Sequence, residues 1–421
     1  MLDVHQAFTG CRPLCCIDMD FDLIIVGAGP AGLCLARALR NTGLRICLVE
    51  KQARSALQQP GFDGREIALT HHSAMLLQHL GIWSHLGDEC IAAIKVALVM
   101  NGPQGPGQSR MAISHSLSPK PELGHLVGNH HIRRAAWAAN FNTSEPGEAP
   151  ELRCGESVAQ LHTDSQGARV TLDSGQQLTA RLVVAADSRH STTRRHMGIN
   201  ADLHDYGRSM VVTCMTHDKP HHDTAVEWFD QGQTIALLPM NPCPETHRHR
   251  SSVVLTLPDH ELQPLMALDE EAWGQALTQR CDHHLGAMQA ASTRHAYPLV
   301  GVWARRFVAQ RFALVGDAAV GMHPVTAHGF NLGLRSVDVL SNAIAAAHQQ
   351  GKDIAASPLL QAYQQAHRRA SRGLFLATHA LATLYIKEQP PARLLRHALV
   401  RLGEHITPFK KAVAGSLTGL A

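Results

Sequence analysis

The sequence has no long apolar run and no cluster of basic residues. Among its 421 residues, no hydrophobic stretch approaches the roughly 18 residues that a membrane-spanning helix needs, so we expect any membrane contact to be peripheral. The net charge of +3 is small, and the Lys and Arg residues are scattered rather than gathered in a block that grips phosphates. We therefore expect no nucleic-acid partner.

The sequence also lacks C-x-x-C pairs and a secretory signal. Its ten cysteines indicate reduced, cytoplasmic thiols packed as small hydrophobic side chains rather than a disulfide framework. Histidines crowd the second half of the chain without metal-ligand spacing, so we expect no metal site and interpret them as solvated loop residues. These histidines include His221, His222, His247, His249, His283 and His284.

The composition, 45% hydrophobic and 17% charged, is typical of a soluble globular chain, and its length suits two domains. The first residues show no periodicity, and Met19 stands just before the first apolar run. We therefore expect residues 1–19 to be a disordered leader, with Met19 as the working start.

A glycine-rich turn follows that first apolar run. Phe21–Val26 is short and rich in Ile and Val, which predicts a strand buried on both faces of a parallel sheet. Three glycines follow in the G-x-G-x-x-G spacing and open a helix: Gly27, Gly29 and Gly32. This spacing permits a tight turn, lets the backbone touch a pyrophosphate, and allows the helix to pack closely on the strand.

A second apolar run, Arg45–Val49, ends in Glu50, where a carboxylate can bind the ribose hydroxyls of an adenosine. A lone glycine triplet is often only a turn, but here the strand, the helix, the second strand and the terminal acid follow in order. The stretch therefore predicts dinucleotide binding, without distinguishing FAD from NAD.

Two arginines and an aspartate extend this prediction. Arg65 precedes a predicted helix and can pair bidentately with a pyrophosphate, with a surface ion pair as the alternative. Arg133 lies on a helix predicted over Asn129–Phe141 and can turn toward cofactor or solvent. Later strands include a hairpin at Asp173–Gly175, and the last of them ends at Asp187, at the edge where α/β sheets bind ligands.

The second half of the chain has a different texture. The range from Tyr206 to Pro258 is predicted to contain a series of strands that form a mixed or antiparallel sheet. An apolar substrate can lie against the surface of such a sheet. A helix is predicted over Glu270–Ala290. After a buried strand at Phe312–Val315, Gly316 allows close approach, and Asp317 can accept hydrogen bonds from a sugar-alcohol chain.

Three helices are predicted to end the chain. The first, over Asn331–Gln349, follows a loop containing Pro324, and the positive charge at its amino end can stabilise the anion of a reduced flavin ring. The others are predicted over Pro358–Ile386 and Ala392–Ile406. The last has an apolar stripe flanked by arginines, which most often faces a core but also suits a membrane surface. The stripe is Leu395, Leu399, Leu402 and Ile406.

Four motifs in order carry a family resemblance: GAGPAG at 27–32, GREIAL at 64–69, AADS at 185–188 and GDAAVGMHP at 316–324. Together they resemble the group A flavoprotein monooxygenases of the para-hydroxybenzoate hydroxylase fold. Within this group, GFNLGLR at 329–335 and WFDQGQTIALLPM at 228–240 are most similar to the ubiquinone-biosynthesis hydroxylases.

The resemblance implies an α/β fold with a discontinuous, Rossmann-like FAD-binding domain, a β-sheet substrate domain and C-terminal helices. We expect the FAD-binding domain at residues 20–200 and 295–350, with 71–128 partly facing the substrate domain. The substrate sheet is expected at 201–294, and the helical region at 351–421.

The same resemblance implies the site residues. The expected cofactor-binding residues are Gly27, Gly29, Pro30, Ala31, Gly32, Glu50, Lys51, Arg65, Arg133, Asp187, Gly316, Asp317, Pro324, Gly329, Phe330 and Asn331. The candidate catalytic residues are His323, Pro324 and His328, and for the two histidines, as for Tyr206, the sequence favours a structural role over a catalytic one.

Members of this family reduce FAD, add O2 to form a C4a-hydroperoxide and transfer its distal oxygen to an electron-rich ring. The resemblance therefore implies an FAD-dependent aromatic hydroxylase of ubiquinone biosynthesis, with NAD(P)H or another reductant as electron donor. The implied substrate is a prenylated phenol or quinol of the demethoxyubiquinol type. We expect a cytoplasmic protein that contacts the inner face of the membrane and a ubiquinone-biosynthesis assembly. Hydroxylation of a soluble phenol and a flavin-binding scaffold subunit without turnover are the alternatives.

Two departures from the family pattern concern the flavin surroundings. Asp187-Ser188 replaces the usual Asp-Gly, and Thr-Ala-His-Gly at 326–329 replaces the common Ala-Gly-Gln-Gly. These departures leave the reductant and the ring position open, but not the binding of FAD.

Overall fold

The computed structural model describes residues 19–142, 149–230, 232–326, 328–386 and 389–418. The expected leader up to residue 18, and Ala327 in the loop before the helix expected over Asn331–Gln349, lie outside the described residues.

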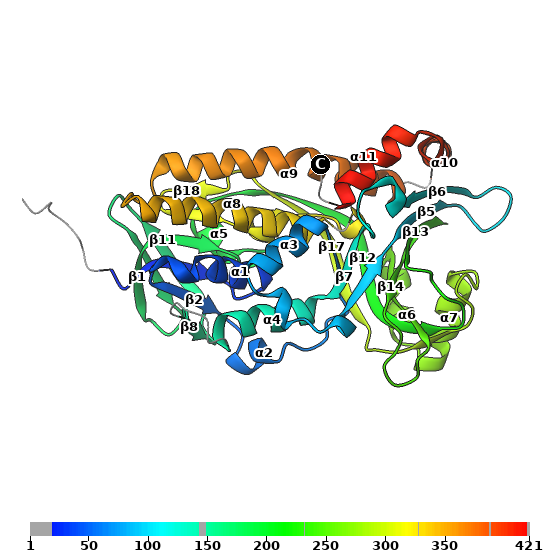
Figure 1. Cartoon of the computed structure of the whole chain (residues 1–421), viewed down its shortest axis with the longest axis horizontal. Coiled ribbons are helices and arrows are strands. Elements are labelled where there is room, and N and C mark those ends of the chain that lie inside the picture. The colour runs from blue at the N-terminus through cyan, green and yellow to red at the C-terminus, as the bar shows by residue number, and fades with distance from the viewer. Residues whose placement is uncertain (1–18, 143–148, 231, 327, 387–388, 419–421) are drawn as a thin grey trace, which may run out of the picture.

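The first sheet lies on the left of Figure 1 and is built around five parallel strands in the order β8-β2-β1-β11-β19. Its strands are β1 (Phe21–Val26), β2 (Ile46–Glu50), β8 (Glu151–Cys154), β9 (Val158–Thr163), β10 (Ala168–Leu172), β11 (Gln177–Ala185), β18 (Val308–Ala309) and β19 (Phe312–Leu314). β11 lies between β1 and β19 and is parallel to both. Alternate residues of β1, such as Leu23 and Ile24, belong to two separate hydrophobic cores on opposite faces. The prediction of a strand buried on both faces is therefore confirmed.

Helices cover this sheet, and α1 packs against both α4 and α8. The helices of the first half are α1 (Pro30–Leu39), α2 (Arg54–Gln58), α3 (His71–His79), α4 (Asn129–Phe141) and α5 (Thr192–His196). Those that follow the second sheet are α8 (Gly329–Gln349), α9 (Ser357–Ile386), α10 (Pro390–His405) and α11 (Thr407–Thr418). In Figure 1, α8 and α9 run side by side along the top of the molecule, in agreement with their packing contact.

The second sheet lies on the right of Figure 1, and its strands come from residues between Val96 and Gly321. Its strands are β5 (Val96–Asn101), β6 (Ser109–Ser114), β12 (Ala201–His217), β13 (Thr224–Asp230), β14 (Gln233–Met240), β15 (His249–Pro258), β16 (Met288–Ala290), β17 (His295–Ala304) and β20 (Val320–Gly321). β17 pairs with β12, and β5 pairs in parallel with β13. Residues 295–304, which we assigned to the FAD-binding domain from the sequence, therefore belong to the substrate sheet.

A small third sheet joins the two larger layers. Its strands are β3 (Glu66–Leu69), β4 (Ile91–Ile94) and β7 (Gly124–Gly128). β3 contacts α8 of the cofactor side, whereas β4 and β7 contact β14 of the substrate sheet. This sheet places Arg65, just before β3, between the two layers.

The predicted helix over Glu270–Ala290 is wrong in its second half. After α6 (Asp259–Met266), helix α7 (Glu270–Arg280) ends early, and β16 then pairs with β12. Asp282 and His283 have positive φ angles of 46° and 52°, which a helix does not accommodate. The edge of β12 offers backbone partners for this segment, so long-range pairing overrides the local helical pattern.

The last two helices, α10 and α11, pack on β5 and β6 of the second sheet rather than on the first sheet. α10 contacts β5 and β6 through the face that carries the buried residues Arg396 and Val400, and α11, which the sequence did not predict, follows it. The predicted apolar stripe, about 100° around the helix from this face, is exposed, with Leu395 at 50% and Leu402 at 59% accessible, so the core interpretation of this stripe is wrong. No helix in the described part of the chain is long and apolar enough to cross a membrane.

Candidate functional site

The glycine turn after β1 has the geometry that its spacing predicts. Gly27 has a φ of 104°, and a Cβ there would lie 2.6 Å from the carbonyl oxygen of Ala186. A Cβ on Gly32 would lie 1.9 Å from the carbonyl oxygen of Gly27, so α1 can approach β1 this closely only without a side chain. Gly29 instead faces open space, and a Cβ added to it would meet no atom within 4 Å. Pro30 and Ala31 line a cavity of about 500 Å³ at the amino end of α1, and Gly29 lines it too.

Glu50, the last residue of the neighbouring strand β2, hydrogen-bonds to this turn. Its Oε2 accepts a hydrogen bond from the Ala28 N–H at 2.7 Å, and its Oε1 accepts one from the Gln52 N–H at 2.9 Å. Each carboxylate oxygen can accept a second hydrogen bond, so Glu50 can still hold a ribose hydroxyl. Lys51 is exposed and is not among the residues that line the cavity.

The segment after β19, the second stretch predicted to bind the cofactor, lies beside the glycine turn after β1. Gly316 has a φ of 59°, and a Cβ placed on it would lie 3.1 Å from Cβ of Ala31. Its N–H donates to Ser336 Oγ on α8 at 3.1 Å. Asp317 Oδ2 accepts a hydrogen bond from Arg189 Nη2 at 3.2 Å and lines the cavity. The structure thus brings both predicted stretches to one cavity.

Arg65 and Arg133 enter this cavity from two other elements. The Arg65 guanidinium lies over the ring of Tyr297, and its Nη2 donates to Asp63 Oδ2 at 2.6 Å. Burial acts to raise the pKa of Asp63, but hydrogen bonds from Arg65 and Asn129 outweigh it and hold the pKa below the usual value. Arg65 therefore forms the ion pair that we considered as its alternative and also lines the cavity. Arg133 Nη2 donates to Gln52 at 3.0 Å.

The start of α8 supplies the far wall of this cavity. Pro324, Gly329 and Phe330 line it, as expected. Asn331 is buried instead, where its Oδ1 accepts the Thr70 N–H at 3.1 Å and its Nδ2 donates to the Ala68 carbonyl at 2.8 Å. This amide therefore fixes α8 to the segment after β3 and is not among the lining residues.

Two further predicted residues lie beside the cavity without lining it. Asp187 Oδ2 accepts hydrogen bonds from the N–H and hydroxyl of Thr193, in the first turn of α5. His328 precedes α8, and its carbonyl accepts the Leu332 N–H at 2.9 Å. Their roles in catalysis or cofactor binding stay predictions.

His323 does line the cavity. Burial, with added repulsion from Arg189 and His379, lowers the pKa of His323 to about 4, so the ring is neutral at physiological pH. Its Nδ1 accepts the Val325 N–H at 3.2 Å, which leaves the proton on Nε2. The ring meets Tyr206 edge-on, with 4.7 Å between centroids.

The substrate sheet forms the opposite wall. The cavity has a volume of about 500 Å³ and extends from the glycine turn to this sheet. The sheet residues that line it are Met210, Val212, Glu227, Thr234, Ala236, Leu238, Val254 and Thr256. Glu227 is the one ionisable side chain in this set, and sequence reasoning missed it. The alternation around it in β13 indicated which face it shares, but not that a cavity covers that face.

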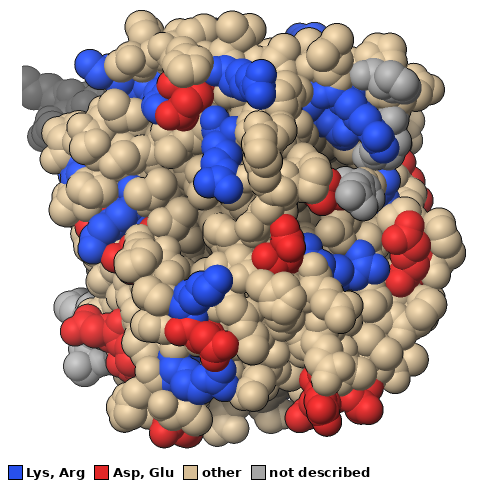
Figure 2. All heavy atoms as spheres, turned by 90° about the vertical axis from the view of Figure 1, so that its right-hand side faces the viewer, with Lys and Arg blue, Asp and Glu red and all other residues tan. Residues whose placement is uncertain are grey.

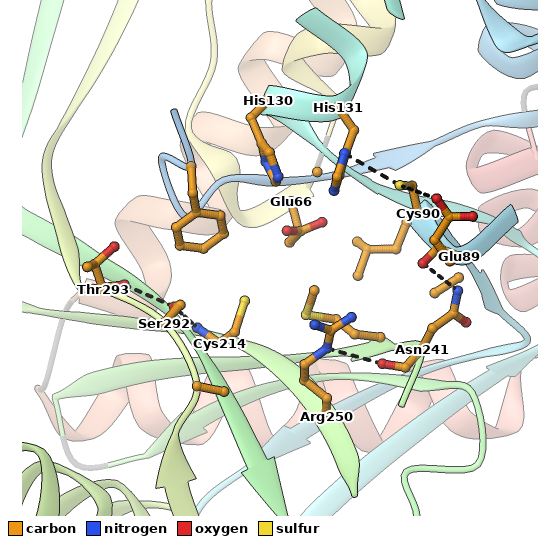
Figure 3. Close-up of a pocket in the computed structure, with 16 residues that line it drawn as sticks. Glu66, Glu89, Cys90, His130, His131, Cys214, Asn241, Arg250, Ser292 and Thr293 are labelled. Atoms are coloured by element: carbon orange, nitrogen blue, oxygen red, sulfur yellow. Dashed lines mark hydrogen bonds between the residues drawn. The ribbon is translucent and has the colours of Figure 1, made fainter. Parts of the chain in front are cut away.

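A second cavity of about 390 Å³ adjoins the first (Figure 3). Glu66 lines both cavities, and burial raises its pKa to about 8. Figure 3 shows His130 and His131 pointing into the second cavity from α4, opposite Arg250 on the substrate sheet. Cys90 Sγ lies 3.4 Å from His131 Nδ1.

Some of the histidines that we interpreted as solvated are in fact packed. A ring nitrogen of His221 lies 3.0 Å from the Met240 carbonyl oxygen, and burial lowers the pKa of His221. The ring of His249 stacks on that of His217, with 6.1 Å between centroids. His249 lies in β15, so its interpretation as a loop residue is wrong, whereas His221 does lie in a loop but is half-buried rather than solvated.

One group of described residues, His71, Glu122 and His125, brings its ligand atoms within 4.8 Å of one another, as a metal site would. His71 Nε2 already lies at hydrogen-bond distance, 2.8 Å, from the Glu122 carbonyl oxygen. Hydrogen bonding accounts for this cluster, and we assign no metal to it. The seven cysteines in the described ranges are free thiols, in agreement with the sequence prediction.

Comparison with known proteins agrees with this geometry. The chain matches the FAD binding domain family over residues 20–376. It is 41% identical to ubiquinone hydroxylase UbiM of Neisseria meningitidis, with 94% of this chain and 84% of that protein covered. It is 34% identical to ubiquinone hydroxylase UbiL of Rhodospirillum rubrum, with 93% and 87% covered. Among solved structures, PqsL of Pseudomonas aeruginosa, a probable FAD-dependent monooxygenase, shares the fold with a TM-score of 0.73 at 22% identity, with 90% of this chain and 99% of that chain covered.

Proposed function

This chain belongs to the FAD-binding family of flavin-dependent monooxygenases, and on that basis we propose that it hydroxylates a prenylated phenol or quinol in ubiquinone biosynthesis. The observation that carries the proposal is the single cavity of about 500 Å³ that joins the glycine turns of the cofactor sheet to the apolar face of the substrate sheet. A demethoxyubiquinol-type ring has the size and polarity to lie on that face.

The residues at the cofactor end fit FAD. The open space at Gly29 and the uncapped amino end of α1 suit a pyrophosphate, and Glu50 suits the adenosine ribose. Arg65 and Arg133 add positive charge nearby, while Asp317 suits the ribityl chain. The start of α8 would lie against the flavin ring. Bound FAD, reduced by NAD(P)H or another donor, supplies the activation of O2 and the transfer of one oxygen atom.

The chain's own contribution at the substrate end is to exclude water and to orient the ring. Met210, Val212, Ala236, Leu238 and Val254 make most of that wall apolar. Such a wall favours a prenylated ring over a small soluble phenol, because it offers few polar partners and buries apolar surface.

We further infer that the exposed face of α10 rests on a membrane surface, from which a prenylated substrate would enter. Leu394 is 72% accessible, and Leu395, Leu399 and Leu402 extend the stripe. The neighbouring helix adds exposed Phe409, and Arg401 and Lys411 flank the apolar side chains. Figure 2, which faces the right-hand side of Figure 1, shows Lys and Arg side chains interspersed with Asp and Glu side chains and with uncharged surface. Contact with a ubiquinone-biosynthesis assembly stays a prediction.

Quinone profiling of a strain that lacks the gene tests the pathway. We expect a precursor that lacks one ring hydroxyl to accumulate, and the wild-type gene to restore ubiquinone. An unchanged profile would remove the pathway assignment. Turnover of simple phenols but not of prenylated quinols by the purified yellow protein would favour the soluble-phenol alternative, and FAD binding without any turnover would favour the scaffold alternative.

A further inference from the structure

Glu227 occupies the middle of a row of side chains that crosses the substrate sheet. In register, it pairs with Val99 on β5 and with Ala236 on β14. Ala236 pairs with Val254 on β15, which pairs with Val212 on β12. Directly paired residues share one face of a sheet, so this row presents a single carboxyl among four apolar side chains.

The face that carries this row is the one toward the cofactor. Val226 and Trp228, the neighbours of Glu227 along β13, belong to the hydrophobic core on the other face, beneath α6 and α7. Glu227, Ala236, Val254 and Val212 line the cavity that also reaches the glycine turns and Pro324. The carboxyl therefore lies in the cavity wall rather than on the outer surface.

Within the described part of the chain, Glu227 has neither a hydrogen bond nor an ion pair. Carboxyl groups removed from water normally gain partners, because an unsatisfied polar group in an apolar site is costly. The burial has a clear electrostatic consequence, since it raises the pKa of Glu227 to about 8. A carboxyl kept in an apolar wall without a protein partner fits a group that receives its partner from a ligand.

One titratable residue on which the charge of Glu227 acts, Tyr385, comes from the C-terminal helices. Tyr385 stacks on Phe229 with 3.3 Å between ring centroids, and Arg396 lies over the Tyr385 ring at 5.8 Å. Burial, and then the charge of Glu227, raise the pKa of Tyr385 to about 12. The end of α9 thus covers β13 next to the carboxyl, close to the start of the exposed α10 stripe.

We propose that the Glu227 carboxyl hydrogen-bonds a ring hydroxyl of the substrate and so fixes which edge of the ring faces the flavin. The proposal rests on the proposed function, because it assumes that a hydroxylated ring enters this cavity. The apolar row on both sides would hold the ring plane, and the carboxyl would set its rotation within that plane. In this arrangement Glu227 determines the position at which the ring is hydroxylated.

The test compares two ligands that differ only at the hydroxyl: a phenol with a short prenyl chain, and its methyl ether. Binding to the FAD-loaded protein is measured from the change in the flavin absorption spectrum, for the wild type and for Glu227→Gln and Glu227→Leu. The wild type should bind the phenol about 10–100-fold more tightly than the ether, which is the usual range for a hydrogen bond to a charged or buried partner. This ratio should shrink in Glu227→Gln, which retains an acceptor, and disappear in Glu227→Leu.

A purely structural role for Glu227 would weaken both ligands equally, and that result would overturn the proposal. An unchanged ratio in Glu227→Leu would also overturn it. Flavin content and thermal unfolding of each variant show whether it folds, and Glu227→Gln keeps the comparison possible if the leucine variant does not. Failure of the wild type to bind either ligand would instead count against the proposed function, so the two failures are distinguishable.

Discussion

The Ala28 N–H donates a 2.7 Å hydrogen bond to Glu50 Oε2, so the glycine turn after β1 is fixed to the end of β2 before any ligand arrives. Ala28 and Glu50 are 22 positions apart in the chain, yet both line the cofactor cavity. The same carboxylate therefore shapes the turn and keeps lone pairs that we propose bind the adenosine ribose.

Removal of this carboxylate should weaken FAD binding. We expect Glu50→Ala to lower the affinity for FAD about 10–100-fold, because hydrogen bonds to a charged acceptor contribute about 1.5–3 kcal/mol each. Titration of the apoprotein with FAD by flavin fluorescence measures this change. Glu270→Ala, at an exposed acid on α7 away from the cavity, is the control and should bind FAD like the wild type.

Two glycines in the same turn should respond differently to a methyl group. Gly29→Ala places its Cβ in open space, so the apoprotein should keep its stability but lose FAD, because the methyl occupies the phosphate position. Gly32→Ala should destabilise the apoprotein as well, since its Cβ would overlap the Gly27 carbonyl oxygen. Thermal unfolding of the apoproteins, together with the flavin to protein absorbance ratio, separates the two effects.

Gly107→Ala, also with open space around its Cβ but in the loop between β5 and β6, is the matched control. It should keep both stability and flavin. Equal flavin content in Gly29→Ala and Gly107→Ala would refute the assignment of the phosphate position.

Ser188 has a φ of 80°, a backbone conformation that favours glycine. We expect Ser188→Gly to stabilise the protein by about 0.5–1 kcal/mol, because relief of left-handed strain exceeds the added entropy of the unfolded chain. Thermal unfolding measures the gain. Ser118→Gly, at a residue with a φ of −125°, should be destabilising instead.

The stability contributed by Glu66 should fall as the pH rises. Burial raises its pKa to about 8, although the charge of Arg250 opposes the shift and that of Asp63 adds to it. The native state thus holds a proton that the unfolded chain releases near its ordinary value of 4.5. The contribution is complete below this value and is lost as the pH rises through about 8.

Glu66→Gln has no proton to lose, so its melting temperature relative to the wild type should increase between about pH 5 and pH 9, where the wild type loses this contribution. Thermal unfolding at a series of pH values measures this difference, and Glu270→Gln corrects for the general effect of one removed charge. A difference that does not vary with pH would show that Glu66 has an ordinary pKa in the native protein.

Loss of the exposed leucines should detach the protein from membranes. We expect Leu394→Ser with Leu402→Ser to lower cosedimentation with vesicles of phosphatidylethanolamine and phosphatidylglycerol about tenfold, because each leucine loses buried apolar contact. Leu203→Ser, at a leucine that is 60% exposed on β12, is the control. Equal binding by the double variant and the wild type would rule out α10 as the contact surface.

Sequence reasoning succeeded where local spacing determines the backbone geometry. The strand at Phe21–Val26 and the helix at Asn129–Phe141 have the predicted bounds, and Gly29, Glu50 and Asp317 meet at one cavity. These features depend on backbone requirements that a glycine, a strand end or a helix start reveals directly.

Sequence reasoning failed where distant strands decide which surface is covered. An alternating strand shows that Glu227 faces away from Val226, but only the layer contributed by the first sheet turns that face into a cavity wall. The stripe on α10 is equally ambiguous, because Leu395 would be buried if the helix docked through the face that carries the stripe. The sequence does not encode these contacts locally.

The order of strands in the first sheet determines at which point of translation the protein can bind its flavin. β1 is synthesised first, but β11 completes its pairing only with β19, and the cavity wall on α8 extends to Gly333 of the 421 residues. A ribosome-bound chain therefore lacks a cofactor site until most of it has been translated, and flavin loading is a late event in the maturation of this protein.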